Sequence, residues 1–156
     1  MTDTNIHQKL QGIQSELKAP KGQTNKFGGY QYRSCEDILT ALKPLLAKWN
    51  CTLAISDDIV EVGGRVYVKA TATLESSGKV DSSINVSGFA REAETKKGMD
   101  DAQITGSASS YARKYALNGL FAIDDTKDPD ATNSHGKDKK SKPQQKETTN
   151  ALDGLM

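Results

Sequence analysis

The sequence has few of the residues that build catalytic and metal sites. It contains two histidines and two cysteines in 156 residues. His7 lies close to the N-terminus and His135 in a polar C-terminal stretch. The sequence shows no nucleophile–base pair, no phosphate-binding loop and no carboxylate cluster with metal-ligand spacing. Cys35 and Cys51 form no CxxC or metal-spaced pattern. We therefore expect that the protein is not an enzyme and that it has no catalytic residue, metal or cofactor. We also expect it to lie in a reducing compartment and to form no disulfide.

Long apolar runs are missing as well. The first seven residues lack the apolar core of a secretion signal. No segment approaches the roughly 20 apolar residues that a membrane helix needs. These absences predict a cytoplasmic protein that has no membrane partner.

Large apolar residues disappear after Asp124. Residues 126–150 contain none, and Lys, Asp, Thr, Ser, Gln and Asn dominate them. Such a segment cannot bury enough surface to offset the entropy of ordering it. We predict a folded domain over residues 1–123 and a disordered tail over residues 124–156. The tail ends in a short apolar tip, residues 151–156, which either docks on a partner such as a host single-strand-binding protein or has no role.

Charge of one sign does not dominate the folded part. Residues 1–123 carry fifteen Lys and Arg against thirteen Asp and Glu, a net charge of +2, and the tail carries six against seven. This balance lacks the strong basic excess of a typical DNA-binding domain. A nucleic-acid site must therefore depend on where the cations lie, or on many subunits acting together.

Two helices are predicted in the first third of the chain. Residues 4–18 place Ile, Leu, Ile and Leu at helical spacing, and Pro20 ends this segment. Ser34 and Asp37 have the spacing of a capping box, and they open a second helix with apolar residues up to Trp49. Because Pro44 lies inside the second helix, we expect a kink or a break there.

Three strands follow, over residues 51–61, 65–75 and 80–90. Gly63 and Gly64 mark a hairpin between the first two strands. In the middle strand Val66, Val68, Ala70, Ala72 and Leu74 alternate with polar residues, so one face is buried and the other is wet. A last helix begins at Asp100 or Asp101 and ends near Gly119. The fold class is thus α+β: a three-stranded antiparallel meander packed on a long C-terminal helix, with two N-terminal helices and a disordered tail.

The last helix is unusually rich in small residues, from Gly106 through Ala112. Such residues weaken an isolated helix but let another backbone approach closely, either that of the domain's own sheet or that of a neighbouring subunit. Tyr111 and Tyr115 share a stripe with apolar residues, which favours a place in the core. Arg113 and Lys114 fall on the opposite side and suit phosphate contacts, the alternative being a solvated helix face.

Basic and aromatic residues interleave in the glycine-rich segment before the second helix. Lys26 and Arg33 flank Tyr30 and Tyr32. Cations that follow phosphates, alternating with rings that accept bases, are typical of single-strand binding, and the alternative is a loop anchored in the core by its tyrosines. Lys96 and Lys97 form a weaker third cluster, diluted by neighbouring glutamates.

Two separated motifs resemble a known family. The first is Gly29-Tyr30-Gln31-Tyr32 with Asp37-Ile38 and Pro44-Leu45-Leu46; the second runs from Gly106 to Leu117 and continues through Leu120-Phe121 to Asp124-Asp125. Together they resemble the essential recombination function (ERF) superfamily of phage single-strand annealing proteins, over roughly residues 6–128.

The resemblance implies an activity and a partner. Such proteins bind single-stranded DNA, anneal complementary strands without ATP in phage recombination, and assemble into rings or filaments in a bacterial host cell. The fold would be similar to the annealing core of the eukaryotic ring-forming recombination mediator, with paired cations of the long helix, here Arg113 and Lys114, lining the DNA groove. The family more often has two arginines, and Lys114 keeps the charge but lacks the planar fork.

Three other functions compete with this interpretation. A double-stranded RNA-binding module has the same helix–three strands–helix order, but it needs lysines at the start of its last helix, where this chain has Met99-Asp100-Asp101. A non-catalytic interaction protein of a recombination complex would bind no nucleic acid at low salt. An enzyme would cleave DNA or turn over ATP.

The predicted domain boundary can be tested by truncation. Deleting residues 126–156 should leave the affinity for single-stranded DNA unchanged in a filter-binding titration, because all the predicted DNA-binding residues precede the cut. A collapse of binding would contradict the boundary.

Overall fold

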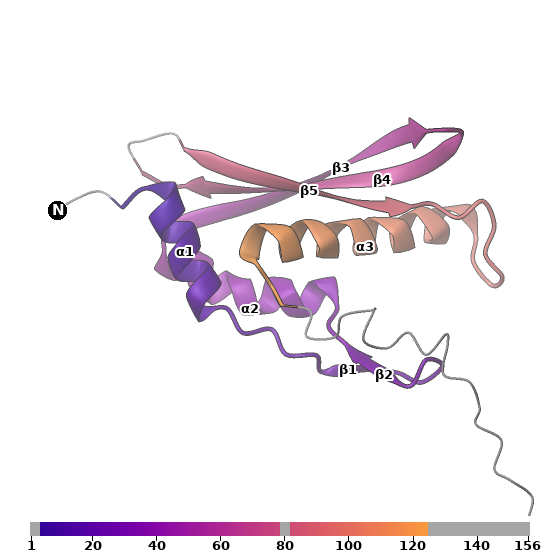
Figure 1. Ribbon diagram of the computed structural model, residues 1–156, viewed down its shortest axis with the longest axis horizontal. Helices are drawn as coiled ribbons and strands as arrows, with labels where there is room; N and C mark the ends of the chain where they lie inside the picture. Colours follow the sequence, from indigo (N-terminus) through magenta and orange to yellow (C-terminus); the bar gives the residue numbers. More distant parts are fainter. Residues whose placement is uncertain (1–3, 79–81, 125–156) are drawn as a thin grey trace, which may run out of the picture. The chain divides into compact units, whose positions relative to one another are not determined.

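Three helices cover one face of a three-stranded antiparallel sheet, and no helix covers the other face in the part of the chain that the structure describes (Figure 1). The structure is a computed structural model that describes residues 4–78 and 82–124. The predicted tail and its apolar tip lie outside the described residues, as does Val80. The α+β class and the antiparallel meander are confirmed.

Helices α1 (Ile6–Glu16) and α2 (Cys35–Lys48) each begin at a capping box. Asn5 caps α1 together with Gln8, and Ser34 caps α2 together with Asp37, as the sequence predicts for α2. Helix α2 continues unbroken through Pro44. Of the expected kink or break, the break is wrong, because α2 packs against the core before the proline through Cys35, Ile38 and Leu42 and after it through the partly buried Leu45 and Leu46.

The main sheet has the order β3-β4-β5, with β3 (Cys51–Val62), β4 (Arg65–Ser76) and β5 (Ser83–Arg91). The pairing of β3 with β4 runs without a bulge from Cys51↔Ser76 to Val62↔Arg65. In β4 four alternate residues face the helices and are buried: Val68, Ala70, Ala72 and Leu74. The predicted alternation is therefore confirmed, except that Val66 at the start of the strand is 36% exposed.

A second, smaller sheet was not predicted. Strands β1 (Gln23–Asn25) and β2 (Tyr30–Tyr32) pair antiparallel in the glycine-rich segment before α2. The side-chain oxygen of Asn25 accepts hydrogen bonds from the backbone N–H groups of Phe27 and Gly28 and so closes the turn. Gly29 completes it with a φ of 64°. The sequence shows the turn residues, but three-residue strands carry no usable alternation.

Helix α3 (Asp101–Phe121) runs along the helix-covered face of the sheet (Figure 1). Asp100 caps it through a capping box with Gln103, as expected. Its predicted end at Gly119 is wrong, because the helix continues to Phe121 and Ala122 closes it at a φ of 51°. Gly119 is needed for packing instead: a Cβ there would lie 2.9 Å from Cγ1 of Val86.

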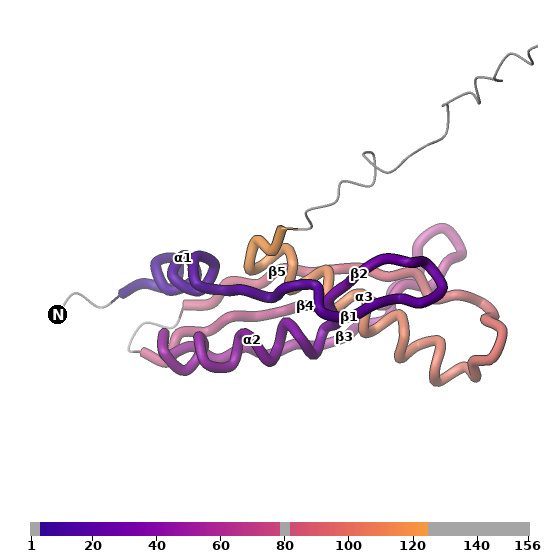
Figure 2. Tube along the Cα trace, turned by 90° about the horizontal axis from the view of Figure 1, so that it is seen from below, coloured from indigo at the N-terminus to yellow at the C-terminus, as the bar shows by residue number. Residues whose placement is uncertain are grey.

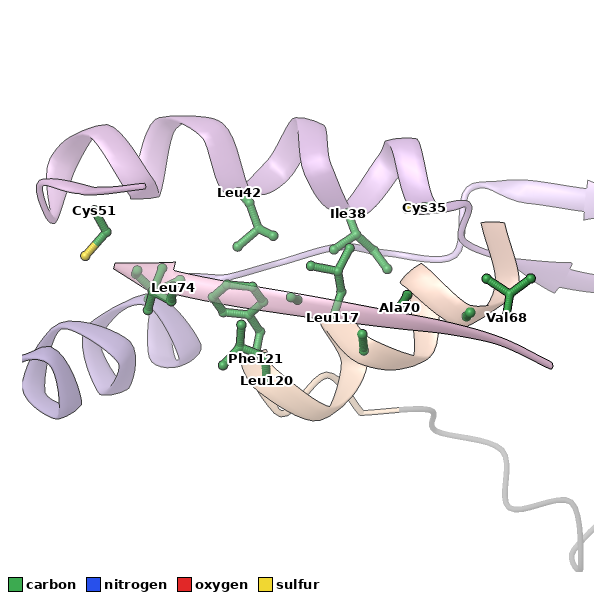
Figure 3. Packing of buried hydrophobic residues seen from close by; sticks show 14 of the residues in the cluster. Cys35, Ile38, Leu42, Cys51, Val68, Ala70, Leu74, Leu117, Leu120 and Phe121 are labelled. Atoms are coloured by element: carbon green, nitrogen blue, oxygen red, sulfur yellow. The ribbon is translucent and has the colours of Figure 1, made fainter. Parts of the chain in front are cut away.

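The core lies between the sheet and the three helices. Figure 2 shows α1 and α2 flanking the C-terminal part of α3. In Figure 3, Ile38 and Leu42 of α2 point toward β4 and toward Leu117 and Phe121 of α3. These four side chains are at most 1% exposed. The end of α3 is thus fixed by apolar burial, which contributes about 1.5–3 kcal/mol for each such side chain.

Helix α3 approaches β5 closely through a seam of small residues. Ala108, Ala112 and Ala116 are buried against the sheet. A Cβ on Gly88 of β5 would lie 2.4 Å from the carbonyl oxygen of Ala112 and 2.5 Å from the nitrogen of Ala116. The small residues therefore serve contact with the domain's own sheet, which was one of the two expected uses.

We expect Gly88→Ala to destabilise the fold by roughly 1–3 kcal/mol, because the new methyl group would meet helix backbone that cannot rotate away. Urea unfolding followed by circular dichroism measures this loss. Gly106→Ala is the matched control, since Gly106 lies on α3 with open space around it. It should be neutral or stabilising by up to about 1 kcal/mol. Equal urea midpoints for Gly88→Ala and Gly106→Ala would contradict the close contact between β5 and α3.

Candidate nucleic-acid interface

A cavity of about 300 Å³ lies where β2, the start of α2 and the middle of α3 meet. We call it the polar cavity. Eight residues line it: Tyr32, Arg33, Ser34, Cys35, Ser107, Ser110, Tyr111 and Lys114. The cavity therefore brings together residues of two sequence segments that are more than seventy positions apart.

Hydroxyl groups and one ammonium group dominate the polar cavity. Ser107, Ser110 and Tyr111 belong to successive turns of α3, and Tyr32 faces them from β2. Hydroxyl groups and ammonium groups are common partners of phosphate and sugar oxygens. Such a lining can hold a polynucleotide backbone without reading its sequence.

The ammonium group of Lys114 lies over an aromatic ring. Its Nζ is 5.1 Å from the ring centroid of Tyr111, within the range of a cation–π contact. Tyr111 and Tyr115 in turn have ring centroids 6.2 Å apart. Both rings are about half exposed, at 47% and 48%. A cation and two solvent-accessible rings thus occupy one strip of the helix surface.

The neighbouring cation, Arg113, is held by an internal carboxylate. Its Nε donates to Oδ1 and Oδ2 of Asp57 on β3 at 3.0 and 3.2 Å, and its Nη2 donates to Oδ2 at 3.1 Å. The hydroxyl of Ser109 donates to the same carboxylate. This clamp ties α3 to the edge strand β3 on the side of the helix away from Tyr111 and Tyr115.

The clamp shifts the titration of its carboxylate. Burial raises the pKa of Asp57, but the hydrogen bonds from Arg113 and Ser109 and the guanidinium charge outweigh it, so the pKa is lowered overall. In the polar cavity, burial raises the pKa of the Cys35 thiol, and the charge of Glu36 raises it further. Cys35 therefore stays protonated at neutral pH and is a poor nucleophile.

A second cavity, of about 370 Å³, lies between β5 and α3. We call it the apolar cavity. It is lined largely by apolar and aromatic side chains, with Arg91, Lys96 and Ser107 as polar neighbours: Phe89, Ala90, Ala93, Ile104, Ala108, Tyr111 and Tyr115. Ser107 and Tyr111 belong to both cavities, so the two adjoin on α3.

The structure distributes the predicted DNA-binding residues unevenly. Tyr32, Arg33 and Lys114 line the polar cavity, and Lys96 lines the apolar one. Lys26, Tyr30 and Lys97 are exposed but line neither. Tyr30 packs edge-on against Tyr32, with ring centroids 6.2 Å apart.

Arg33, a further predicted DNA-binding residue, is largely buried. Arg33 is only 7% exposed, and its Nη2 donates to the backbone carbonyl of Asp124 at 3.1 Å. A guanidinium in this position links the start of α2 to the end of the folded unit. Arg33 thus lines the polar cavity with little exposed surface, and its contact with phosphate stays a prediction.

Among residues 4–78 and 82–124, no group of three or more His, Cys, Asp or Glu side chains lies close enough together to hold a metal ion. None of the helices there is long and apolar enough to cross a membrane.

Comparison with known proteins gives the family. A family model described as the ERF superfamily matches residues 6–153. The chain belongs to the ERF superfamily. The resemblance seen in its two motifs is therefore confirmed.

One curated relative of this ERF chain is the "Essential recombination function protein" of Salmonella phage P22. The two are 54% identical over 138 residues, which cover 88% of this chain. The match spans 64% of the relative's length, so the relative is longer. No solved structure matches.

Three aromatic residues that line the two cavities of this ERF chain were not predicted from the sequence: Tyr111, Tyr115 and Phe89. The prediction that Tyr111 and Tyr115 are core residues is wrong, because both are half exposed. The alanines at positions 108, 112 and 116 define a buried stripe at four-residue spacing, and the tyrosines lie one step beside it. Choosing the small residues as the buried stripe would have found them.

We expect Asp57→Asn to lower the free energy of unfolding by about 1 kcal/mol at pH 7, because it removes the charge of the clamp. Since the folded pKa of Asp57 is depressed, its contribution is present above the ordinary carboxyl pKa of about 4 and is lost as the pH falls below it. The difference from wild type, measured by urea unfolding, should therefore shrink toward pH 3. Asp58→Asn, one residue away on the opposite sheet face, is the control. If the loss of unfolding free energy in Asp57→Asn does not depend on pH, the ion pair between Asp57 and Arg113 does not stabilise the fold.

Proposed function

We propose that this ERF chain binds single-stranded DNA without sequence preference and anneals complementary strands without ATP, in phage homologous recombination. The observation that carries the proposal is the polar cavity, where Tyr32, Tyr111 and Lys114 converge from β2 and α3. Rings that accept bases beside cations that contact phosphates are the general means of binding unpaired strands. Membership of the family and the name of the P22 relative support the recombination role.

Lys114 is the main phosphate contact in this proposal. Arg113 contributes less, because Asp57 already occupies two of its donor nitrogens. Lys26, Tyr30, Lys96 and Lys97 are exposed cations and a ring at the margins, and they extend the path of the strand. With a net charge of +1 for the whole chain, one copy binds weakly. Many copies in a ring or filament add their counterion release along one strand.

Annealing requires no catalytic residue. The protein must hold the phosphates and leave the Watson–Crick edges free to pair, which a shallow, sequence-blind groove does. We therefore propose a non-catalytic role in the bacterial cell that a phage infects. The predicted partner of the apolar tip, a host single-strand-binding protein, stays a prediction.

Lys114→Ala should weaken binding to oligo-dT and reduce the salt slope by about one, because one phosphate contact is lost. Tyr111→Ala and Tyr32→Ala should each cost about 1–3 kcal/mol of binding, as expected for a lost stacking partner, and Tyr→Phe at either position should restore most of it. Fluorescence anisotropy over a series of salt concentrations measures both effects.

Lys43→Ala is the matched control, since Lys43 is exposed on α2 and lies outside the polar cavity. Its affinity and salt slope should equal those of wild type. Duplex RNA in the same titration tests the competing RNA-binding module. Annealing of two labelled complementary strands without ATP tests the activity itself. Equal affinities for Lys114→Ala, Tyr111→Ala and wild type would remove the polar cavity from the site.

A further inference from the structure

Both outer strands of the main sheet have an open edge in residues 4–78 and 82–124. The order β3-β4-β5 leaves one side of β3 and one side of β5 without a pairing strand. Edges of this kind are usually blunted by prolines, bulges, short strands or charged side chains, and β3 has only the last of these. Strand β3 is twelve residues long, contains no proline and pairs with β4 without a bulge. It is therefore competent to pair with a further strand.

The β3 edge also exposes large apolar side chains. Ile59 is 60% exposed and Val62 is 64% exposed. Ile59 pairs with Val68, and Val68 pairs with Ala90, so Ile59 points to the helix-covered face of the sheet. An isoleucine on that face of an edge strand is in place to join an apolar layer beneath an extended sheet.

The two edges carry opposite charges. Strand β3 contains Asp58 and Glu61, besides Asp57, whose charge Arg113 offsets, and it contains no basic residue. Strand β5 contains Arg91 and no acidic residue. Two β3 edges placed together would repel each other, whereas β3 against β5 is electrostatically favourable. This asymmetry selects a contact between the two different edges of two copies.

The apolar cavity lies beside β5, where side chains of a strand paired with β5 would point toward α3. It is bordered by Phe89 and Ala90 of β5 and by Tyr111 and Tyr115 of α3. A strand paired with β5 would lie about 4.8 Å from it and direct alternate side chains toward α3. The cavity, of about 370 Å³, is large enough for an isoleucine side chain.

We infer that β3 of one copy pairs along β5 of the next copy and inserts Ile59 into the apolar cavity. Strands β3 and β5 are each antiparallel to β4, so copies in the same orientation join with these strands parallel. The contact joins unlike surfaces and repeats, which produces rings or filaments rather than closed pairs. The inference rests on the proposed function for its purpose, since it lines up the polar cavities of successive copies.

The test blocks each edge separately in the full chain. Ile59→Asp puts a charge on the β3 edge, and Tyr115→Glu puts one in the apolar cavity at a residue that does not line the polar cavity. Sedimentation velocity over a concentration series measures the mass of each variant. Wild type should form assemblies of more than two copies. Each variant alone should need a roughly hundredfold higher concentration to assemble, because a buried carboxylate without a partner is costly.

An equal mixture of the two variants separates this contact from any symmetric one. Each variant keeps the edge that the other has lost, so the mixture should form a one-to-one dimer and nothing larger. Val66→Asp is the matched control, because Val66 faces the same side but lies on the central strand. It should assemble like wild type. Unchanged assembly of Ile59→Asp, a mixture that stays monomeric, or a monomeric wild type would each overturn the inference.

Binding to oligo-dT is measured on the same samples. Wild-type assemblies that do not bind oligo-dT would contradict the proposed function and leave the edge contact standing. If wild type binds oligo-dT but stays monomeric, the edge contact is contradicted and the proposed binding of single-stranded DNA stands.

Discussion

The close approach of α3 to β5 governs the arrangement of the whole site. Gly88 leaves no room for a side chain between the strand and the backbone of Ala112 and Ala116. The helix therefore cannot rotate or rise without losing its contact with the sheet. This fixed rotation turns Tyr111 and Tyr115 to solvent on one side and Arg113 toward β3 on the other. A backbone contact between Gly88 and α3 therefore determines which side chains of the helix face solvent and which face β3.

The molecule carries little net charge, because its basic and acidic residues nearly balance. A chain with a formal net charge of +1 cannot attract DNA through its overall field. Of the paired cations on α3, one holds a carboxylate and the other lies over a ring. Affinity in the proposed function must then come from repetition and from stacking, both of which tolerate any base sequence. A sequence-blind annealing protein benefits from that, since strong contacts with the strand would oppose its transfer into a duplex.

Much of the scaffold is predictable from the sequence. The capping boxes at Ser34 and Asp100 and the alternation in β4 identify their elements through local chemistry, and the structure confirms them. Errors occur where packing outweighs local preference. Gly119 stays helical because the C-terminal turn is buried against Val86 and α2. Pro44 is accommodated because buried residues of α2 precede it and the partly buried Leu45 and Leu46 follow it against the core.

The site was harder to predict than the scaffold, for a physical reason. Lys114 and Tyr32 were proposed separately from charge and aromatic spacing, but nothing local indicates that they share a cavity. Arg33 looked like a surface cation because the carbonyl that binds it comes from Asp124, ninety-one residues later. Tyr111 and Tyr115 were assigned to the wrong side because large residues were assumed to be the buried ones.

The geometry of the Asp57 clamp has a consequence for the choice of arginine at position 113. The carboxylate is bound through Nε and Nη2, so the Nη1 end of the guanidinium takes no part in that contact. A planar group with five donors can thus serve two anions at once, one internal and permanent, the other external and exchangeable. A lysine at this position would have a single point of charge and would have to abandon one anion to reach the other.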